Sequence, residues 1–316
     1  MVRMQAMRTR LYALFILVVL AAISVPRNRA AAHQAQTTIR TEVALVNLFF
    51  TAKDKKGRAV ENLKREDFQV FENRKLQEIE FFSELDESSK VPLTIALLID
   101  TSGSVKDKLN YEKETASEFF REILRPNMDL ALIIQFDSEI NLVQDFTQDP
   151  DDLLGALDSL RAGNSTSLYD AIYLAAEEKL KLEVGRKVIV VITDGEDTAS
   201  KVKKEEAIEA AQKSDAIIYG MGVRSGGFRH NFGVLKKFAE ETGGDFFSPS
   251  ADPEEIRAAF RAIGHEIHGQ YSLAYRSSNP IKDGKFRSIS IRCNKRGVRI
   301  RARKGYYAPK AAPAFQ

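Results

Sequence analysis

The sequence predicts an α/β fold, a doubly wound and mostly parallel sheet flanked by helices, together with a small antiparallel β domain. In the middle of the chain, short apolar runs alternate with segments of helical periodicity, which is typical of βαβ units. At both ends, runs rich in β-branched and aromatic residues lack a helical period, which indicates antiparallel strands. We expect the N- and C-terminal segments to form the second domain together.

The predicted parallel sheet has its clearest strand at residues 93–99, an apolar run bounded by Pro92 and Gly103. A run of that length suits a strand buried on both faces. Further strands are expected at residues 129–136, 187–193, 215–223 and 244–249. Helical patterns occupy residues 106–125, 151–160, 168–183, 203–213, 231–242 and 253–267. Residues 139–146 alternate directly after a strand, so we expect an antiparallel hairpin arm there.

The flanking segments each predict too few strands to bury a core alone. Residues 38–85 contain three or four short strand patterns. Residues 269–308 contain three more, GQYSLAYRSS, KFRSISIRC and GVRIRARKGYY, with turn signals between them. The resulting division is a β segment at 38–88, the α/β domain at 90–267, and a C-terminal β segment at 268–310 that packs with the first.

Residues 1–32 have the three-part pattern of a secretory signal. A basic start is followed by an apolar run at 11–25 and by small residues at 30–32. The run is shorter than the ~20 residues of a spanning helix, which favours cleavage over retention as an N-terminal anchor. The sequence therefore predicts a secreted, periplasmic or envelope-associated protein, with membrane contact only through an uncleaved leader.

Composition and motifs exclude several classes of function. The chain has 47 Lys and Arg against 44 Asp and Glu, a balance that does not suggest nucleic acid as a partner. A single cysteine, Cys293, excludes an intramolecular disulfide. No nucleophile elbow of the form G-x-S-x-G or phosphate loop occurs, and the HEIH at 265–268 lacks zincin spacing. We therefore do not expect an enzyme.

Three polar loops follow or precede the predicted elements in a way that suggests a cation site. Asp100, Ser102 and Ser104 alternate after the first strand, and Asp194 follows the most apolar one. A third loop offers Thr166 between two serines, just before a helix. Ligands of open α/β sheets bind at the carboxyl ends of the strands, and oxygen-only sites suit hard divalent cations. These hydroxyls could instead simply cap turns and helices.

The three loops, in this order, resemble a von Willebrand factor type A domain that carries the metal-ion-dependent adhesion site. The family's D-x-S-x-S loop is matched by Asp100, Ser102 and Ser104, its threonine by Thr166, and its T-D-G turn by Asp194. One departure is Ser165, where the family often has glycine. The resemblance covers residues 90–265 and implies a Rossmann-like fold. The flanks resemble a group of secreted bacterial proteins with this domain.

The resemblance implies that these five residues hold Mg²⁺, or Mn²⁺ or Ca²⁺, directly or through water. An Asp or Glu carboxylate of a protein partner would then complete the coordination shell. The expected function is thus divalent-metal-dependent adhesion to a protein. Two alternatives are a structural interaction protein whose metal site only stabilises the fold, and a metal-dependent hydrolase.

Overall fold

The computed structural model describes residues 45–86, 88–103, 109–163, 165–194, 196–224 and 231–311. The predicted leader at 1–32 and the predicted metal ligand Ser104 lie outside these residues.

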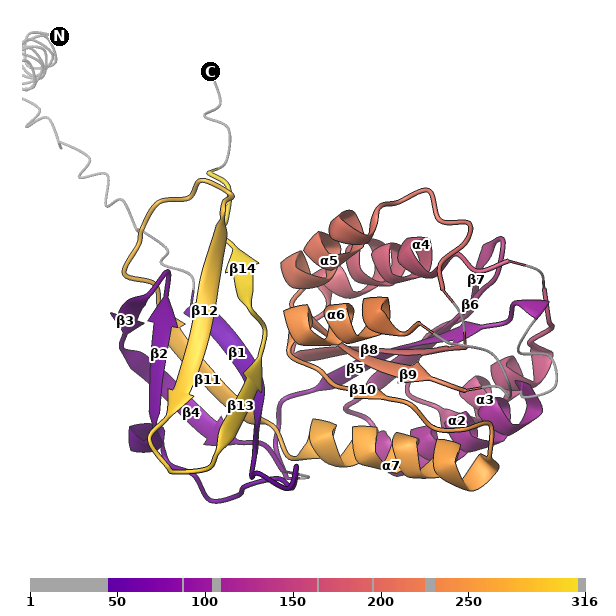
Figure 1. Ribbon diagram of the computed structural model, residues 1–316, viewed down its shortest axis with the longest axis horizontal. Helices are drawn as coiled ribbons and strands as arrows, with labels where there is room; N and C mark the ends of the chain where they lie inside the picture. The colour runs from indigo at the N-terminus through magenta and orange to yellow at the C-terminus, as the bar shows by residue number, and fades with distance from the viewer. Residues whose placement is uncertain are drawn as a thin grey trace, which may run out of the picture. The chain divides into compact units, whose positions relative to one another are not determined.

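A six-stranded sheet in the order β10-β9-β8-β5-β6-β7 forms the centre of the α/β domain (Figure 1). Its strands are β5 (Leu93–Asp100), β6 (Leu130–Phe136), β7 (Ile140–Thr147), β8 (Arg186–Thr193), β9 (Ala216–Gly222) and β10 (Phe246–Phe247). All pairs are parallel except β6 with β7. The predicted fold class, including the antiparallel arm, is confirmed. Every residue of β5 and β8 is buried, as expected for central strands covered on both faces.

Helices cover both faces of this sheet (Figure 1). One layer contains α2 (Leu109–Ile123), α3 (Pro150–Ser159) and α7 (Pro253–His268), whose apolar side chains pack against alternate residues of the sheet. The other layer contains α4 (Leu168–Tyr173), α5 (Lys204–Lys213) and α6 (Gly233–Thr242). The predicted helix at 168–183 is not regular, because α4 continues as a π-helical segment, Leu174–Lys179, and a 3-10 turn, Leu180–Leu182.

The β domain consists of two four-stranded antiparallel sheets with the orders β13-β1-β11-β4 and β14-β12-β2-β3. The N-terminal segment supplies β1 (Leu45–Lys53), β2 (Phe68–Glu72), β3 (Lys75–Gln77) and β4 (Ile79–Glu84). The C-terminal segment supplies β11 (Tyr271–Arg276), β12 (Phe286–Cys293), β13 (Arg299–Ala302) and β14 (Gly305–Tyr307). Each sheet therefore contains strands from both ends of the chain, as predicted.

One strand prediction is wrong in detail. The run GVRIRARKGYY forms two strands, because the chain changes sheets between them. β13 pairs with β1, and β14 pairs with β12. At the change, the Lys304 amide donates to the Glu241 carbonyl, and the Lys304 carbonyl accepts from the Ile289 amide. A pattern of alternating residues does not reveal such a change of partner.

A buried ion pair lies between the two sheets of the β domain. The Glu72 carboxylate accepts hydrogen bonds from the hydroxyls of Tyr275 and Tyr306 at 2.9 Å each, and from Ser277 at 2.8 Å. The Arg287 guanidinium completes the set at 3.3 Å. Burial raises the pKa of Tyr275, and the adjacent carboxylate adds to the effect, so this phenol remains a donor. Glu72 is thus a buried charge whose partners all come from the protein.

Candidate metal site

The predicted metal ligands lie where the strand order of the sheet reverses. β5 is flanked by β6 on one side and β8 on the other, and both pairs are parallel. Asp100 is the last residue of β5, and Asp194 directly follows β8. Chain connections diverge from this point in opposite directions, which opens a crevice at the carboxyl ends of the strands. The fold therefore places both carboxylates on the edge where such sheets bind ligands.

Asp100 is fully buried, and its carboxylate is oriented by its neighbours. One oxygen accepts the hydroxyl hydrogen of Thr193, and the other accepts the Ser102 amide at 2.8 Å. Burial raises the pKa of Asp100 to about 6, with a smaller contribution from the nearby Asp194 carboxylate, although the hydrogen bonds from Thr193 and Ser102 oppose the shift. Asp194 itself is only 3% exposed. A divalent cation between these two acids would offset their burial and repulsion.

The loop containing Thr166 is tied to both other loops through backbone hydrogen bonds. The Thr166 amide donates to the Thr198 hydroxyl at 3.0 Å, and the Thr198 amide donates back to the Thr166 carbonyl at 2.8 Å. On the other side, the Gly163 amide donates to the Thr101 carbonyl at 2.5 Å. A side chain at Gly163 would collide with the Asp137 carboxylate, so this approach requires glycine.

A second set of hydrogen bonds holds the start of α4 against the loop after β8. The Asp170 carboxylate accepts the amides of Lys201 and Val202, at 2.7 Å for Val202. The Ser200 hydroxyl accepts the amides of Tyr169 and Asp170 and donates to Asp197. Sequence analysis did not identify these supporting residues. The only signal for them is the density of acids and hydroxyls in TDGEDTAS at 193–200.

Four of the five predicted ligands belong to the described residues, and all four are buried: Asp100, Ser102, Thr166 and Asp194. Ser165, by contrast, is half-buried. Thr166 is connected to the loop after β8 by its backbone hydrogen bonds with Thr198. In the described part of the chain, no group of three or more His, Cys, Asp or Glu side chains is arranged for a metal. Any cation here would depend on hydroxyl oxygens beside two acids, a set that fits a hard divalent ion.

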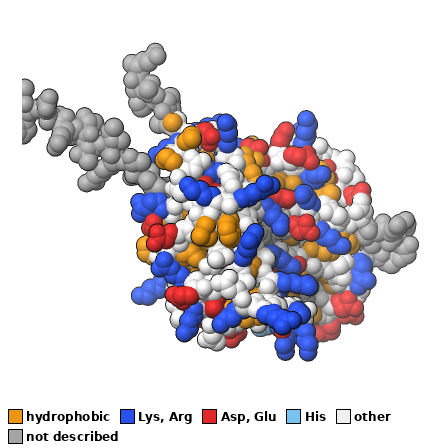
Figure 2. Space-filling view, turned by 60° about the vertical axis from the view of Figure 1, so that its left-hand side comes forward, with side chains coloured by type: hydrophobic (Ala, Val, Ile, Leu, Met, Phe, Trp, Pro, Cys, Tyr) orange, Lys and Arg blue, Asp and Glu red, His pale blue; other side chains and the backbone are white. Residues whose placement is uncertain are grey.

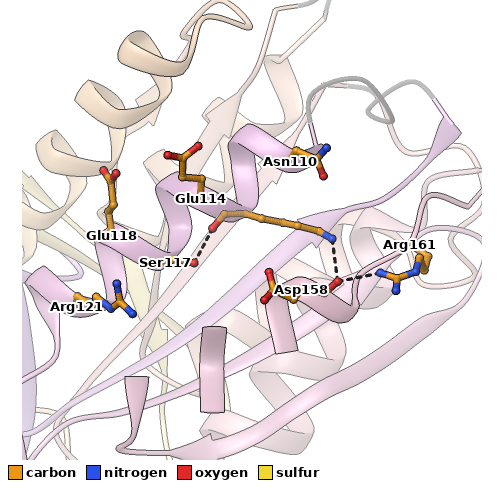
Figure 3. Close-up of a pocket in the computed structure, with 8 residues that line it drawn as sticks. Asn110, Glu114, Ser117, Glu118, Arg121, Asp158 and Arg161 are labelled. Carbon is orange, nitrogen blue, oxygen red and sulfur yellow. Dashed lines mark hydrogen bonds between the residues drawn. The ribbon is translucent and has the colours of Figure 1, made fainter. Parts of the chain in front are cut away.

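A polar groove of about 740 Å³ lies along α2 (Figure 3). Asn110, in the first turn of α2, and Arg161, two residues before Gly163, lie at the end of the groove opposite Arg121 (Figure 3), and this end is close in the chain to two of the predicted metal loops. Lys113 donates to the Asp158 and Leu160 carbonyls at 3.2 and 3.0 Å and thereby joins α2 to the end of α3. Cations and acids balance in its lining, which consists of Asn110, Lys113, Glu114, Ser117, Glu118, Arg121, Asp158 and Arg161.

Comparison with known proteins identifies the class of this domain. The profile of the von Willebrand factor type A domain matches residues 94–262, more than half of the sequence. The chain belongs to this family. Domains of the family are protein-interaction and adhesion modules, are generally non-enzymatic, and often bind a divalent metal at an adhesion site.

Individual relatives are distant. An uncharacterized protein of Borreliella burgdorferi is 25% identical over 187 residues, which is 50% of this chain and 54% of that protein. The chain thus spans about half the length of this curated relative. Among solved structures, the conserved hypothetical protein BatB from Bacteroides thetaiotaomicron aligns with a TM-score of 0.47 and 22% identity, over 55% of this chain and 97% of that one.

Proximal thread matrix protein 1 from the mussel byssus aligns with a TM-score of 0.52 and 16% identity, over 62% of this chain and 50% of that one. Another structure of the same mussel protein, with a zinc-occupied adhesion-site motif, aligns with a TM-score of 0.50 and 17% identity, over 59% and 48% of the two chains. At these identities the structural likeness concerns the fold alone. No helix among the described residues has both the length and the apolar character needed to cross a membrane.

Proposed function

We propose that this protein binds a protein partner through a divalent cation held by Asp100, Ser102, Ser104, Thr166 and Asp194. The observation that carries the proposal is the position of two buried acids side by side at the point where the strand order reverses. With hydroxyls as the remaining protein ligands, the cation stays electrophilic and would accept an Asp or Glu carboxylate from the partner. The protein residues would hold the cation, directly or through water, and leave one position for the partner.

Oxygen ligands decide which metal we propose. Zinc in proteins prefers nitrogen and sulfur ligands, whereas Mg²⁺ takes oxygens in near-octahedral geometry and commonly retains water. The zinc in the mussel protein supports a divalent ion at this kind of motif. For the present oxygen set we propose Mg²⁺, with Mn²⁺ or Ca²⁺ as substitutes.

The groove along α2 extends the proposed partner surface. Because Asn110 and Arg161 are close in the chain to two of the metal loops, a peptide whose carboxylate reaches the cation would continue into the groove. There Glu114 is an exposed acid, and Lys113 is held in place by its two carbonyl partners. The balanced charges of the groove favour a partner segment with both acidic and basic side chains.

We further propose the envelope or the extracellular space as the compartment, with residues 1–32 as the leader. The division into a β segment at 38–88, the type A domain at 90–267 and a C-terminal β segment at 268–310 belongs to the same proposal. The leader pattern and the adhesion class of the family support it.

A purely structural metal is the second candidate, and one observation favours it. Burial raises the pKa of Asp100 to about 6, so any cation that neutralises this carboxylate would also stabilise the fold. The two candidates differ in whether metal is needed for partner capture in protein that is already folded.

The test measures metal binding and partner capture separately. Isothermal titration with MgCl₂ should give a saturable signal for the intact chain and none for Asp194→Ala. Capture of surface proteins should fail both with chelator and with Asp194→Ala, while circular dichroism shows that the variant is folded. The matched control is Glu178→Gln, which changes an exposed acid on the π-helical segment.

Capture that persists with chelator, by a folded Asp194→Ala chain, would refute the adhesion mechanism. A variant that binds no metal and unfolds would instead support the structural role.

A further inference from the structure

Three connections, two of them near in sequence and the third more than 200 residues further on, meet at one end of the β domain, the lower end in Figure 1. They are the turn at 54–58 after β1, the turn at 64–67 before β2, and the β12–β13 connection at 294–298. The Asn294 amide donates to the Asp67 carbonyl at 2.8 Å. A Cβ atom at Gly297 would lie 3.6 Å from the Lys55 side chain. We call this group, together with Arg299, the basic end.

The basic end has eight cationic side chains and three acids. Two of the acids have partners within the basic end. Asp54 accepts the amides of Lys56 and Arg58 and pairs with the Arg58 guanidinium at 2.7 Å. Asp67 accepts the Lys64 amide and faces Lys295 at 3.4 Å. Backbone hydrogen bonds lower the pKa of both acids, so both stay ionised within these contacts.

Six cations of the basic end form no salt bridge with any residue that the structure describes. All six are exposed: Lys55, Lys56, Lys64, Arg65, Arg296 and Arg299. The only remaining acid of this end is the exposed Glu66. Lys and Arg side chains gather over the face of the molecule that Figure 2 turns forward, with fewer acids between them.

This excess of positive charge belongs to the β domain and not to the whole chain. Residues 269–311 hold twelve Lys and Arg and a single acid, Asp283. Residues 91–268 have the opposite balance, with 32 acids and 20 Lys and Arg. The overall charge of +3 therefore conceals a strongly basic domain beside a strongly acidic one. A basic surface of this kind attracts polyanions.

We propose that the basic end binds the phosphate-bearing headgroups of an anionic phospholipid membrane. Its cations come from three separate turns on flexible side chains, an arrangement suited to many mobile headgroups. Each Lys or Arg near such a surface contributes a factor of roughly five in affinity.

The length of the preceding chain also favours a membrane. The apolar run of the leader ends at Val25, and β1 begins at Leu45. An extended chain of that length reaches roughly 70 Å, at up to about 3.6 Å per residue. β1 itself spans roughly 30 Å at about 3.3 Å per residue. A leader held in a bilayer would leave the basic end within reach of the same bilayer.

The test compares vesicle binding of the full chain with that of two charge-matched variants. One variant neutralises the basic end by Lys55→Gln, Lys56→Gln, Lys64→Gln and Arg296→Gln. The control removes four exposed cations elsewhere by Lys90→Gln, Lys201→Gln, Lys236→Gln and Arg261→Gln. Co-sedimentation is measured with vesicles of phosphatidylcholine alone and with 30% phosphatidylglycerol. The readout is the ratio of the affinity for vesicles with phosphatidylglycerol to the affinity for vesicles without it. An apolar contribution of the leader would be the same for both and would therefore cancel in this ratio.

For the unmodified chain and for the control, we expect phosphatidylglycerol to raise affinity at least 50-fold, with loss of the gain at high salt. The basic-end variant should lose most of this gain. Chelator should change nothing, which separates this proposal from the metal site. An unmodified chain without preference for phosphatidylglycerol, an equal loss in the control, or displacement by duplex DNA at equal phosphate concentration would each overturn the proposal.

Discussion

The two domains of this chain surround a buried carboxylate with opposite kinds of neighbour. In the β domain, Glu72 is surrounded by a guanidinium and three hydroxyl groups, so the protein itself satisfies the charge. In the α/β domain, Asp100 is equally buried but lies near a second acid, and its pKa is raised to about 6. The first arrangement stabilises a fold, whereas the second suits a cation. The comparison shows that burial alone does not distinguish a structural acid from a site residue.

The largest expected effect concerns Glu72, the carboxylate that is paired within the β domain. Glu72→Ala leaves the Arg287 guanidinium buried without its counter-ion, so we expect a loss of about 3–5 kcal/mol in the free energy of unfolding. Denaturant titration measures it. The matched control is Glu80→Ala, which removes the carboxylate that pairs with the exposed Arg276 on the surface and should cost less than about 1 kcal/mol. Equal losses in the two variants would show that the buried Glu72 contributes no more to the free energy of unfolding than a surface carboxylate does.

The second prediction concerns Asp100, the buried carboxylate that lies near a second acid, in the presence of chelator. The pKa of Asp100 in the folded chain is about 6, above its ordinary value of 3.8. Its contribution to stability is therefore complete below pH 3.8 and is lost as the pH rises through about 6. Asp100→Asn should thus make the metal-free chain more stable at pH 7 by about 3 kcal/mol, with little effect near pH 4. Thermal unfolding at both pH values checks this, and a variant less stable than the original at pH 7 would contradict it.

The third prediction concerns the stabilisation that a cation provides. At a Mg²⁺ concentration 100 times its dissociation constant, the unmodified chain should gain about 2.7 kcal/mol. Asp194→Ala should gain nothing, because one of the two acids is missing. Glu178→Gln should behave like the original chain. The measurement is the unfolding temperature across a MgCl₂ titration, and a full gain in Asp194→Ala would place the cation elsewhere.

The smallest expected effect concerns the support of the second loop. Thr198→Ala removes the hydroxyl that accepts the Thr166 amide, so the loop loses one of its anchors. We expect a cost of about 1 kcal/mol, seen as roughly five-fold weaker Mg²⁺ binding. Ser83→Ala, at an exposed position of β4, is the control. Unchanged Mg²⁺ affinity in Thr198→Ala would mean that Thr166 is positioned without this bond.

Local pattern was sufficient to predict most of the α/β domain. The apolar run before Asp100 becomes β5, fully buried, and the alternating run at 139–146 becomes the antiparallel β7. These predictions succeed because burial on one or two faces imposes a period on neighbouring residues. The predicted metal ligands stay a prediction, although four of them are buried on loops that hydrogen bonds tie together.

The sequence by itself determined the strands, the helices and the order of the three polar loops, because these depend on residues close together in the chain. Only the tertiary structure decided the division of GVRIRARKGYY between two sheets and the hydrogen bond from Thr193 to Asp100. It also decided the pairing of Glu72 with Tyr275, 203 residues away, and the meeting of three turns at the basic end. These features arise from contacts between segments of the chain. The periodicity within one segment does not indicate which other segment it will contact.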